Sequence, residues 1–489
     1  MHTRRQFCSQ LAGMAGLALT PDALHAAASN SKRPNIVVFL IDDMGWGDLG
    51  CYGDTFHETP NIDQLARESM KFTNAYAGAP VCSPSRAAIL TGKAPARLHL
   101  TQWIPGVFYK HKKLLEAPTP LHLNRNVPTI AKMLKSAGYH TGAIGKWHLG
   151  GEGYLPEDFG FDVNIAGDNH GHPPSYFGPY NFHNLTGYTA KDYLTDVLTQ
   201  KMDAFVQDAA AKGPFFLYMA EYSVHLPLQA KLDMIEKYRR KNGGKDEPDP
   251  IYAAMIESTD IALGSLRTVL QRAGVADNTI ILLTSDNGGV GFQGRRLHRI
   301  ADNGPLRAGK GYLYEGGIRE PFLVHWPGVT KPNTVCDVPV SGLDLMPTIL
   351  QMTGAGPVPE PYDGLDITGL LRGGAAPQRD TLYWHYPHYS DQGGTPGGAI
   401  REGDWKLIEF FEDNHLELYN LALDPGEQYN FASSYADKAW DLRRKLASWR
   451  ESVNAVMPTP NPNYDPTQAE VHAGPVGCSW LPGPECRED

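Results

Sequence analysis

The chain has 489 residues, of which 42% are hydrophobic and 20% are charged, and this composition is typical of a globular protein. The formal net charge of −10 at pH 7 argues against a nucleic acid as a partner, because phosphate backbones are bound by clustered Lys and Arg. The net charge does not exclude a small anionic substrate, since the charges next to a site decide what the site binds.

Residues 1–28 are predicted to be an export signal of the twin-arginine type. Residues 3–7 (TRRQF) supply the basic region, residues 8–19 a short apolar region, and residues 26–28 (AAA) small residues for cleavage. The alternative is a disordered, basic N-terminus. The apolar region is too short to cross a bilayer, and no later segment is long and apolar enough for a membrane helix. We therefore expect an exported bacterial protein, periplasmic or extracellular, without a membrane span.

Three apolar runs are predicted to be strands buried on both faces, as in a parallel sheet: residues 35–41, 215–219 and 279–284. Polar residues follow these runs, and they are Asp42, Asp43, His225, Asp286 and Asn287. Ligands of open α/β sheets bind beyond the carboxyl ends of the strands. These side chains from three distant segments are therefore expected at one rim of the sheet.

Two stretches between these strands, residues 129–137 and 251–273, have the apolar spacing of helices, and each is followed by a glycine. Alternating strands and helices predict an α/β fold, with a large, mostly parallel central sheet flanked by helices. A Gly/Pro-rich stretch, residues 354–377, marks a boundary, and we place the first domain at residues 32–375.

Residues 378–456 are predicted to be a small antiparallel sheet with one helix. The strands of this sheet are expected at residues 381–385, 398–401, 405–411 and 416–419. Residues 457–489 are predicted to be a Pro-rich, loop-like tail. In this tail Cys478 and Cys486 lie close together in sequence, and a local disulfide between them would fit an oxidising compartment.

Asp42, Asp43, Asp286 and Asn287 form a set of oxygen donors at the predicted rim. Carboxylate and amide oxygens are the ligands of hard divalent cations, and Ca²⁺ accepts about six to eight of them. This set contains no His or Cys, which favours Ca²⁺ or Mg²⁺ over Zn²⁺. Two solvated turns are the alternative.

The most specific motif is residues 82–86 (CSPSR), followed at once by the small-residue segment 87–92 (AAILTG). A Cys-x-Pro-x-Arg run ahead of such a segment resembles the signature of type I sulfatases, in which the cysteine is oxidised after translation to formylglycine. The alternative for the motif alone is a structural cysteine beside a turn proline.

Three further segments agree with the sulfatase pattern in order and in local sequence: residues 145–150 (GKWHLG), 224–227 (VHLP) and 309–317 (GKGYLYEGG). Each one alone is weak, because loop lysines and packing histidines are common. Together they make the chain similar, from about residue 33 to 455, to type I formylglycine-dependent sulfatases of the alkaline-phosphatase superfamily. The fold that this resemblance implies is alkaline-phosphatase-like.

The resemblance also implies which residues form the site. The catalytic residues are Cys82, Arg86, Lys146, His148, His225 and Lys310, and the ligands of the cation are Asp42, Asp43, Cys82, Asp286 and Asn287. It favours Ca²⁺ over Mg²⁺ as the cofactor beside the formylglycine, and it implies a formylglycine-generating enzyme as a partner during maturation.

In the implied mechanism the formylglycine is a hydrated aldehyde that attacks sulfur with one hydroxyl, which the metal acidifies and Arg86 holds. Lys146 and Lys310 bind the sulfate oxygens. His225 with Lys310 protonates the leaving oxygen. His148 then removes the proton of the second hydroxyl, which expels sulfate and restores the aldehyde.

Two loops rich in His and aromatic residues are candidates for binding a sugar. They are residues 168–176 (DNHGHPPSY), with His170 and His172, and residues 384–389 (WHYPHY), with His385 and His388. The alternative is that both loops only pack. Residues 226–230 (LPLQA) resemble bacterial carbohydrate sulfatases related to galactosamine sulfatases. The expected reaction is therefore exo-acting sulfate removal from a galactose or N-acetylgalactosamine unit.

Two other functions compete with this one. The first is a phosphodiesterase or phosphonate monoester hydrolase of the same superfamily, although a two-metal phosphatase would need further His and Asp ligands after Asn287. The second is a calcium-dependent carbohydrate-binding protein, which would not need Cys82, Lys146 and Lys310 together.

Overall fold

The computed structural model describes residues 33–245, 247–291 and 300–469. The predicted export signal, and Cys478 with Cys486, lie outside the described residues. Among the helices that are described, none combines the length and the apolar content needed to cross a membrane.

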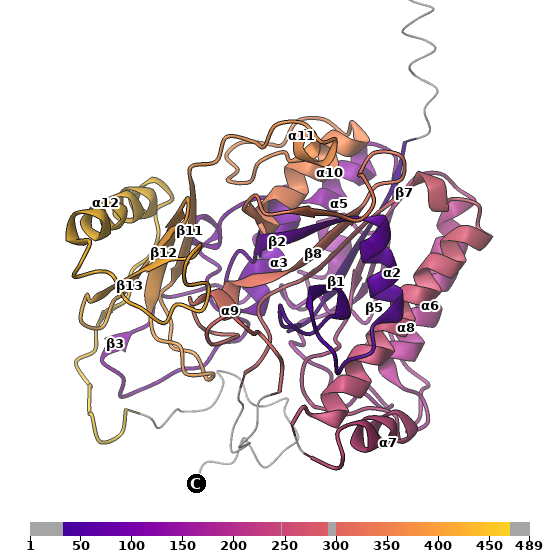
Figure 1. The fold of residues 1–489 in the computed structure, drawn as a ribbon. Coiled ribbons are helices and arrows are strands. Elements are labelled where there is room, and N and C mark those ends of the chain that lie inside the picture. Colours follow the sequence, from indigo (N-terminus) through magenta and orange to yellow (C-terminus); the bar gives the residue numbers. More distant parts are fainter. Residues whose placement is uncertain (1–32, 246, 292–299, 470–489) are drawn as a thin grey trace, which may run out of the picture. The chain divides into compact units, whose positions relative to one another are not determined.

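The described residues from 34 onward contain a nine-stranded sheet (Figure 1). Its strand order is β10-β2-β8-β7-β1-β6-β4-β5, and β9 pairs with β2. The strands are β1 (Asn35–Ile41), β2 (Met70–Tyr76), β4 (His140–Gly145), β5 (Val163–Ile165), β6 (Phe215–Ala220), β7 (Thr279–Ser285), β8 (Arg319–His325), β9 (Thr334–Cys336) and β10 (Val340–Ser341). Only β8 runs antiparallel to its neighbours within this described sheet. The mostly parallel sheet predicted from the sequence is confirmed.

Strand β1 is buried on both faces of the sheet. Its side chains alternate between two hydrophobic cores, with Val37, Phe39 and Ile41 in one core and the even-numbered residues 36–40 in the other. A strand covered on both faces must be an unbroken apolar run, because an alternating polar residue would be buried without water. The same reason explains the apolar runs of β6 and β7.

Different helices close the two cores (Figure 1). The core that contains Val37 is covered by α2 (Pro60–Glu68), α6 (Leu194–Ala210), α7 (Leu232–Lys241) and α8 (Pro250–Arg272). The opposite core is covered by α3 (Cys82–Thr91), α5 (Ile130–Ser136), α10 (Leu345–Thr353) and α11 (Thr368–Leu371). The two helices predicted from apolar spacing are α5 and α8. Shorter helical segments are α4 (Pro95–Leu98), α9 (Glu315–Ile318), η1 (Gly50–Tyr52), η2 (Pro156–Phe159), η3 (Ala276–Asn278) and η4 (Gly342–Asp344).

A second, four-stranded sheet follows in the order β11-β12-β13-β14, and all of its pairs are antiparallel. Its strands are β11 (Thr381–Tyr386), β12 (Gly397–Glu402), β13 (Trp405–Phe410) and β14 (Leu416–Asn420), and α12 (Ala436–Ser452) follows them. Helix α12 packs on one face through Leu442 and Leu446. The other face packs against Tyr76, Leu313 and Ile318 of the first part of the chain. The small sheet with one helix is thus confirmed.

The described beginning of the tail differs from the predicted loop. Thr459–Pro460 (β15) pairs antiparallel with β3 (Leu114–Leu115). The Asn461 amide then donates to the carbonyl oxygens of Lys110 and Lys112, at 3.0 and 2.7 Å. A Pro-rich composition hides this pairing, because a proline is accepted on a strand whose N–H side needs no partner.

Candidate active site

The loops that follow four neighbouring parallel strands meet at one rim of the sheet. Strands β7, β1, β6 and β4 are adjacent in that order, so their carboxyl ends lie next to one another. The candidate residues that follow these strands are Asp286 and Asn287, Asp42 and Asp43, His225, and Lys146 and His148. The rim predicted from the sequence therefore gathers side chains from four loops, and the loop after β4 is among them.

Cys82 is the first residue of α3 and follows β2, which runs in the same direction as β7 and β1, so it lies at the same edge of the sheet. Arg86 follows one helical turn later, so both side chains lie on the same face of the helix. The Cys82 Sγ lies 3.9 Å from Asp42 Oδ1, and its side chain is buried. Burial raises the pKa of the Cys82 thiol to about 11, against the lowering effect of Lys146 and Lys310. An unmodified Cys82 is therefore a protonated thiol and a poor nucleophile at neutral pH.

The guanidinium of Arg86 is fully buried and binds residues of the three loops that follow β7, β4 and β1. Its Nε donates to Asp286 Oδ2 at 2.8 Å, and its Nη1 donates to the Lys146 carbonyl oxygen at 2.8 Å. Its Nη2 lies 3.5 Å from Asp42 Oδ1. A buried charge is tolerated only when it is paired in this way, and removing one partner leaves the other charge uncompensated.

The two carboxylates after β1 are each paired with a lysine. Lys146 Nζ lies 2.6 Å from Asp42 Oδ2, and Lys310 Nζ lies 2.8 Å from Asp43 Oδ2. Burial raises the pKa of Asp42 well above its ordinary value, in spite of Lys146. Burial also acts to raise the pKa of Asp43, but Lys310 and then His225 lower it below its ordinary value.

The donor atoms fit a divalent cation. The Asn287 amide nitrogen donates to Asp43 Oδ1 at 2.7 Å, whereas Asn287 Oδ1 is buried and has no hydrogen-bond partner among the described residues. Such an orphaned carbonyl oxygen is costly unless something binds it. Ligand atoms of Asp42, Asp43, Cys82 and His225 all lie within 4.8 Å of one another. Carboxylate and amide oxygens in one buried cluster are the donor set of a hard cation.

His225 and Lys310 form a hydrogen-bonded pair. The Lys310 Nζ lies 3.0 Å from His225 Nε2, and the other ring nitrogen of His225 lies 3.1 Å from the Leu226 carbonyl oxygen. Burial and then Lys310 lower the pKa of His225 well below its ordinary value. Burial would lower the pKa of Lys310, but Asp43 raises it well above its ordinary value. The proton of this pair therefore resides on the lysine.

His148 lies in the loop after β4. Its side chain is buried, and its backbone has the left-handed conformation, with a φ of 56°. Its Nε2 contacts the Ile104 carbonyl oxygen, and its amide donates to the Asp168 carbonyl oxygen at 2.9 Å. Burial and then Lys146 lower the pKa of His148 well below its ordinary value. The imidazole is therefore neutral and can accept a proton.

Comparison with known proteins identifies the family. Residues 34–355 match the protein family described as Sulfatase, and residues 308–452 match the family described as N-sulphoglucosamine sulphohydrolase, C-terminal. The chain belongs to the sulfatase family. It is accordingly a sulfatase, an enzyme that hydrolyses sulfate esters, and members of its family generally use a formylglycine and a divalent cation.

Named relatives cover nearly the whole sulfatase. Human arylsulfatase A is 33% identical, over 87% of this chain and 88% of the relative. Human N-acetylgalactosamine-6-sulfatase is 33% identical, over 93% of this chain and 92% of the relative. The solved structure of Ps i-CgsB in complex with k-i-k-neocarrahexaose is 31% identical, with a TM-score of 0.72 over 89% of this chain and 96% of that one. A sulfatase is therefore favoured over a phosphoryl enzyme and over a binding protein.

The two histidine loops have different surroundings in this sulfatase. The His172 ring stacks on the ring of His225, with centroids 5.8 Å apart and planes 10° apart. His170 Nδ1 lies 2.6 Å from Asp168 Oδ1. The loop of residues 168–176 therefore lies against the Lys310–His225 pair through the His172 ring, and its role in binding a sugar stays a prediction.

His385, in β11, and His388, two residues after this strand ends, are both buried instead. His385 Nε2 lies 2.9 Å from the Val456 carbonyl oxygen, and His388 Nε2 lies 2.8 Å from Thr101 Oγ1. Burial lowers the pKa of His385 to about 4 and that of His388 to about 3. Both rings therefore have the contacts of packing residues, which was the alternative interpretation. Composition could not separate the two cases, because a His-rich segment has the same letters whether it faces solvent or a core.

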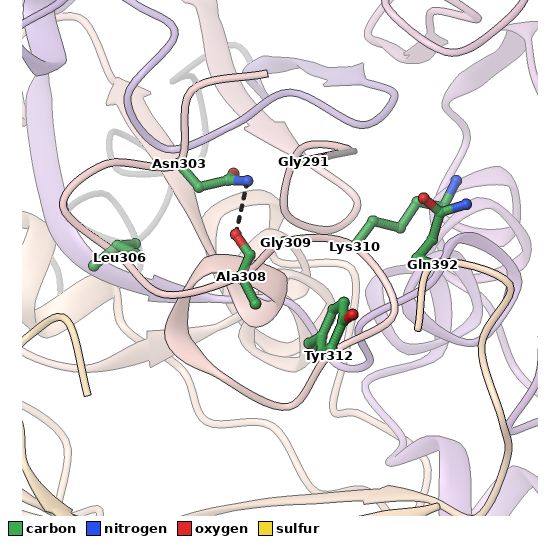
Figure 2. Close-up of a pocket in the computed structure, with 8 residues that line it drawn as sticks. All are labelled: Gly291, Asn303, Leu306, Ala308, Gly309, Lys310, Tyr312 and Gln392. Carbon is green, nitrogen blue, oxygen red and sulfur yellow. Dashed lines mark hydrogen bonds between the residues drawn. The ribbon is translucent and has the colours of Figure 1, made fainter. Parts of the chain in front are cut away.

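A cavity beside Lys310 was not predicted. It has a volume of about 210 Å³, and Figure 2 shows the residues that line it. These residues are Gly291, Asn303, Leu306, Ala308, Gly309, Lys310, Tyr312 and Gln392. Gln392 comes from the loop between β11 and β12, and its Oε1 is buried without a hydrogen-bond partner in the described part of the chain. No sequence signal marks Gln392, because only the packing of the small sheet against the first part brings it to Lys310.

Proposed function

We propose that this sulfatase removes a sulfate group from a sugar, with a formylglycine at position 82 and a divalent cation at the rim. The observation that carries the proposal is the position of Cys82, which is buried among three carboxylates and three cationic side chains at the end of the sheet. These charged residues are Asp42, Asp43, Asp286, Arg86, Lys146 and Lys310.

Support for modification of Cys82 comes from its ionisation. A thiol whose pKa burial raises to about 11 is protonated at neutral pH and would react slowly. A formylglycine supplies a hydroxyl that can attack sulfur and a second hydroxyl through which the aldehyde is restored. Its formation requires a formylglycine-generating enzyme in the host.

Support for a cation comes from the oxygen donors, and Asp42, Asp43, Asp286 and Asn287 are the residues that would hold it, with residue 82. Ca²⁺ is the ion we favour, because the protein donors are carboxylate and amide oxygens. When bound, the ion would stabilise negative charge on the sulfate and acidify a neighbouring hydroxyl. The orphaned Asn287 Oδ1 is the donor atom for which the described residues offer no other partner.

The remaining residues divide the work of charge and proton transfer. We assign Lys146 and Lys310 to the sulfate oxygens, because their ammonium groups lie at the rim and would balance the negative charge of the sulfate. Lys310, together with His225, delivers the proton to the leaving oxygen. Neutral His148 then accepts the proton of the second hydroxyl of residue 82, so that sulfate is expelled and the aldehyde is restored. Arg86 holds Asp42 and Asp286 in place.

We propose a sulfated galactose or N-acetylgalactosamine unit as the substrate, attacked from a chain end. The curated relative named N-acetylgalactosamine-6-sulfatase supports this class of sugar. The cavity in Figure 2 is lined in part by Lys310, and because we assign the leaving-group proton to Lys310, we also assign the sugar to this cavity. The loop with His170 and His172 lies against the Lys310–His225 pair through the His172 ring. We also propose that the protein is exported to the periplasm or the cell exterior.

A cysteine-exchange experiment tests the nucleophile. We expect Cys82→Ala to abolish hydrolysis of an aryl sulfate and of galactose 6-sulfate, while the thermal unfolding temperature stays close to wild type. Cys336→Ala is the matched control, because Cys336 is also a buried cysteine but lies in β9. Mass spectrometry of the residue-82 peptide measures conversion in each preparation. Activity above a few per cent of wild type in Cys82→Ala would overturn the proposal.

A further inference from the structure

The imidazole of His148 is held from more than one side. Its Nε2 contacts the Ile104 carbonyl oxygen, and its Nδ1 is buried without a hydrogen-bond partner among the residues that the structure describes. Gly171 packs against the ring so closely that a Cβ at this position would lie 2.7 Å from His148 Cε1. The ring therefore has little room to turn, and its two nitrogens have different surroundings.

These surroundings determine which nitrogen carries the proton. A carbonyl oxygen only accepts hydrogen bonds, so the His148 Nε2 that contacts Ile104 must be protonated. The imidazole is neutral, because burial and Lys146 lower its pKa well below the ordinary value. A neutral imidazole carries one ring proton, and Nδ1 is therefore left as the acceptor.

Ile104 is in turn fixed by the residue next to Cys82. The Ile104 amide donates to Ser83 Oγ at 3.1 Å, and Ser83 is 0% exposed. The Ile104 side chain is also buried in the core on the α3 side of the sheet. A chain of two hydrogen bonds thus runs from the second residue of α3, through Ile104, to the ring of His148.

We propose that Ser83 is a positioning residue that keeps His148 in its Nε2–H form, through Ile104, so that Nδ1 accepts a proton. The proposal rests on the proposed role of His148 as a proton acceptor. It gives the hydroxyl of Ser83 a task that is separate from the neighbouring cysteine. Ser85 supplies the comparison, because its Oγ is equally buried in the same segment but has no hydrogen-bond partner within the described residues.

The first test reads the tautomer directly, without any activity. Protein labelled with ¹⁵N-histidine is made without the modifying enzyme, so that residue 82 stays cysteine, and His148→Gln identifies the signals of His148. We expect a single neutral Nε2–H form in wild type and in Ser85→Ala. In Ser83→Ala the ¹⁵N shifts should move towards a mixture of the two tautomers, and Ser83→Thr should restore them. Shifts in Ser83→Ala that match wild type would overturn the proposal.

The second test uses the matured enzyme, with every rate divided by the formylglycine content measured by mass spectrometry. Ser83→Ala should lower the steady-state kcat by about 10–100-fold, as loss of an orienting hydrogen bond does at other sites, while KM and the first burst of released alcohol stay near wild type. Ser85→Ala should leave all three unchanged. Ser83→Gly removes the same hydroxyl and replaces the alanine variant if that one unfolds. A full kcat in the variants that lack the hydroxyl would contradict the proposal.

The two tests separate this inference from the function on which it rests. If His148→Gln keeps full turnover, the role of His148 as proton acceptor is wrong, and the ¹⁵N shifts still decide whether Ser83 sets its tautomer. If His148→Gln loses turnover but Ser83→Ala does not, the proposed function stands and the positioning role is wrong.

Discussion

Replacement of His225 by alanine should separate good from poor leaving groups. The His225 Nε2 lies 3.0 Å from Lys310 Nζ and 3.4 Å from Asp43 Oδ2. Without the imidazole, the Lys310 ammonium keeps only the Asp43 carboxylate of these two partners, at 2.8 Å. The ammonium is then drawn towards the carboxylate and away from the leaving oxygen.

The size of the effect follows from the chemistry of the leaving group. A positioned proton donor contributes about 10²–10⁴-fold to a reaction whose leaving group needs a proton. A sugar hydroxyl is such a group, so His225→Ala should lower kcat on a sulfated sugar by about this factor, or about 3–5 kcal/mol in activation free energy. Nitrophenolate leaves without a proton, and the loss on nitrophenyl sulfate should stay below about tenfold.

The assay compares the two substrates in wild type, His225→Ala, Lys310→Met and the double variant. The pair shares one proton, and groups that act as a unit show losses that do not add. The double variant should therefore be little worse on the sugar than the poorer single variant. Equal losses of His225→Ala on both substrates would refute the assignment of the leaving-group proton to this pair.

Three further predictions concern the cation and the stability of the fold. Chelation should abolish activity and lower the unfolding temperature, and Ca²⁺ should restore both; stoichiometric zinc in elemental analysis of the purified protein would contradict this. For His388, whose pKa burial lowers to about 3, the unfolded chain binds a proton below pH 6.5 that the folded chain does not. The free energy of unfolding should therefore fall as the pH falls from 6.5 towards 3, by at most about 1.4 kcal/mol per pH unit. In urea unfolding at several pH values, His388→Gln should show a weaker dependence of this free energy on pH. An equal dependence in wild type and variant would count against the prediction. Lys406→Met should lower the free energy of unfolding by about 3–5 kcal/mol, because it leaves Glu315 and Glu427 buried without their ammonium partner; a loss near that of a surface ion pair, below about 1 kcal/mol, would contradict the structure.

The strands were predicted where burial leaves a clear pattern. The runs at residues 35–41, 215–219 and 279–284 became β1, β6 and β7 with ends that differ by at most one residue. Strand β8 was not predicted, because Arg319, Glu320 and Pro321 interrupt the apolar pattern at its start. Its antiparallel direction depends on tertiary pairing with β7 and β2, which local sequence does not contain.

The site was predicted where its residues follow strands or belong to a motif. Asp42, Asp43, Asp286 and Asn287 needed only the rule that parallel strands end at one rim. Gln392 and the link from Ser83 to His148 could not be predicted, since they depend on contacts between segments far apart in sequence. Ser83 and Ile104 lie 21 residues apart, and no periodicity relates them.

A buried group of ionic side chains connects the small sheet to the segment that carries Lys310. The Lys406 ammonium on β13 lies 2.9 Å from Glu315 Oε1 and 2.9 Å from Glu427 Oε1, and all three side chains are 0% exposed. The Glu315 amide donates to Glu427 Oε2 at 2.7 Å, so the start of α9 is bound to the C-terminal part by both backbone and side chain. Lys310 lies five residues before Glu315, and its amide donates at 3.1 Å to the carbonyl oxygen of Gly289, which lies in the loop after β7. The segment that carries Lys310 is therefore bound on one side to the loop after β7 and on the other side to the C-terminal part, so we expect the position of the Lys310 ammonium, to which we assign the leaving-group proton, to depend on both.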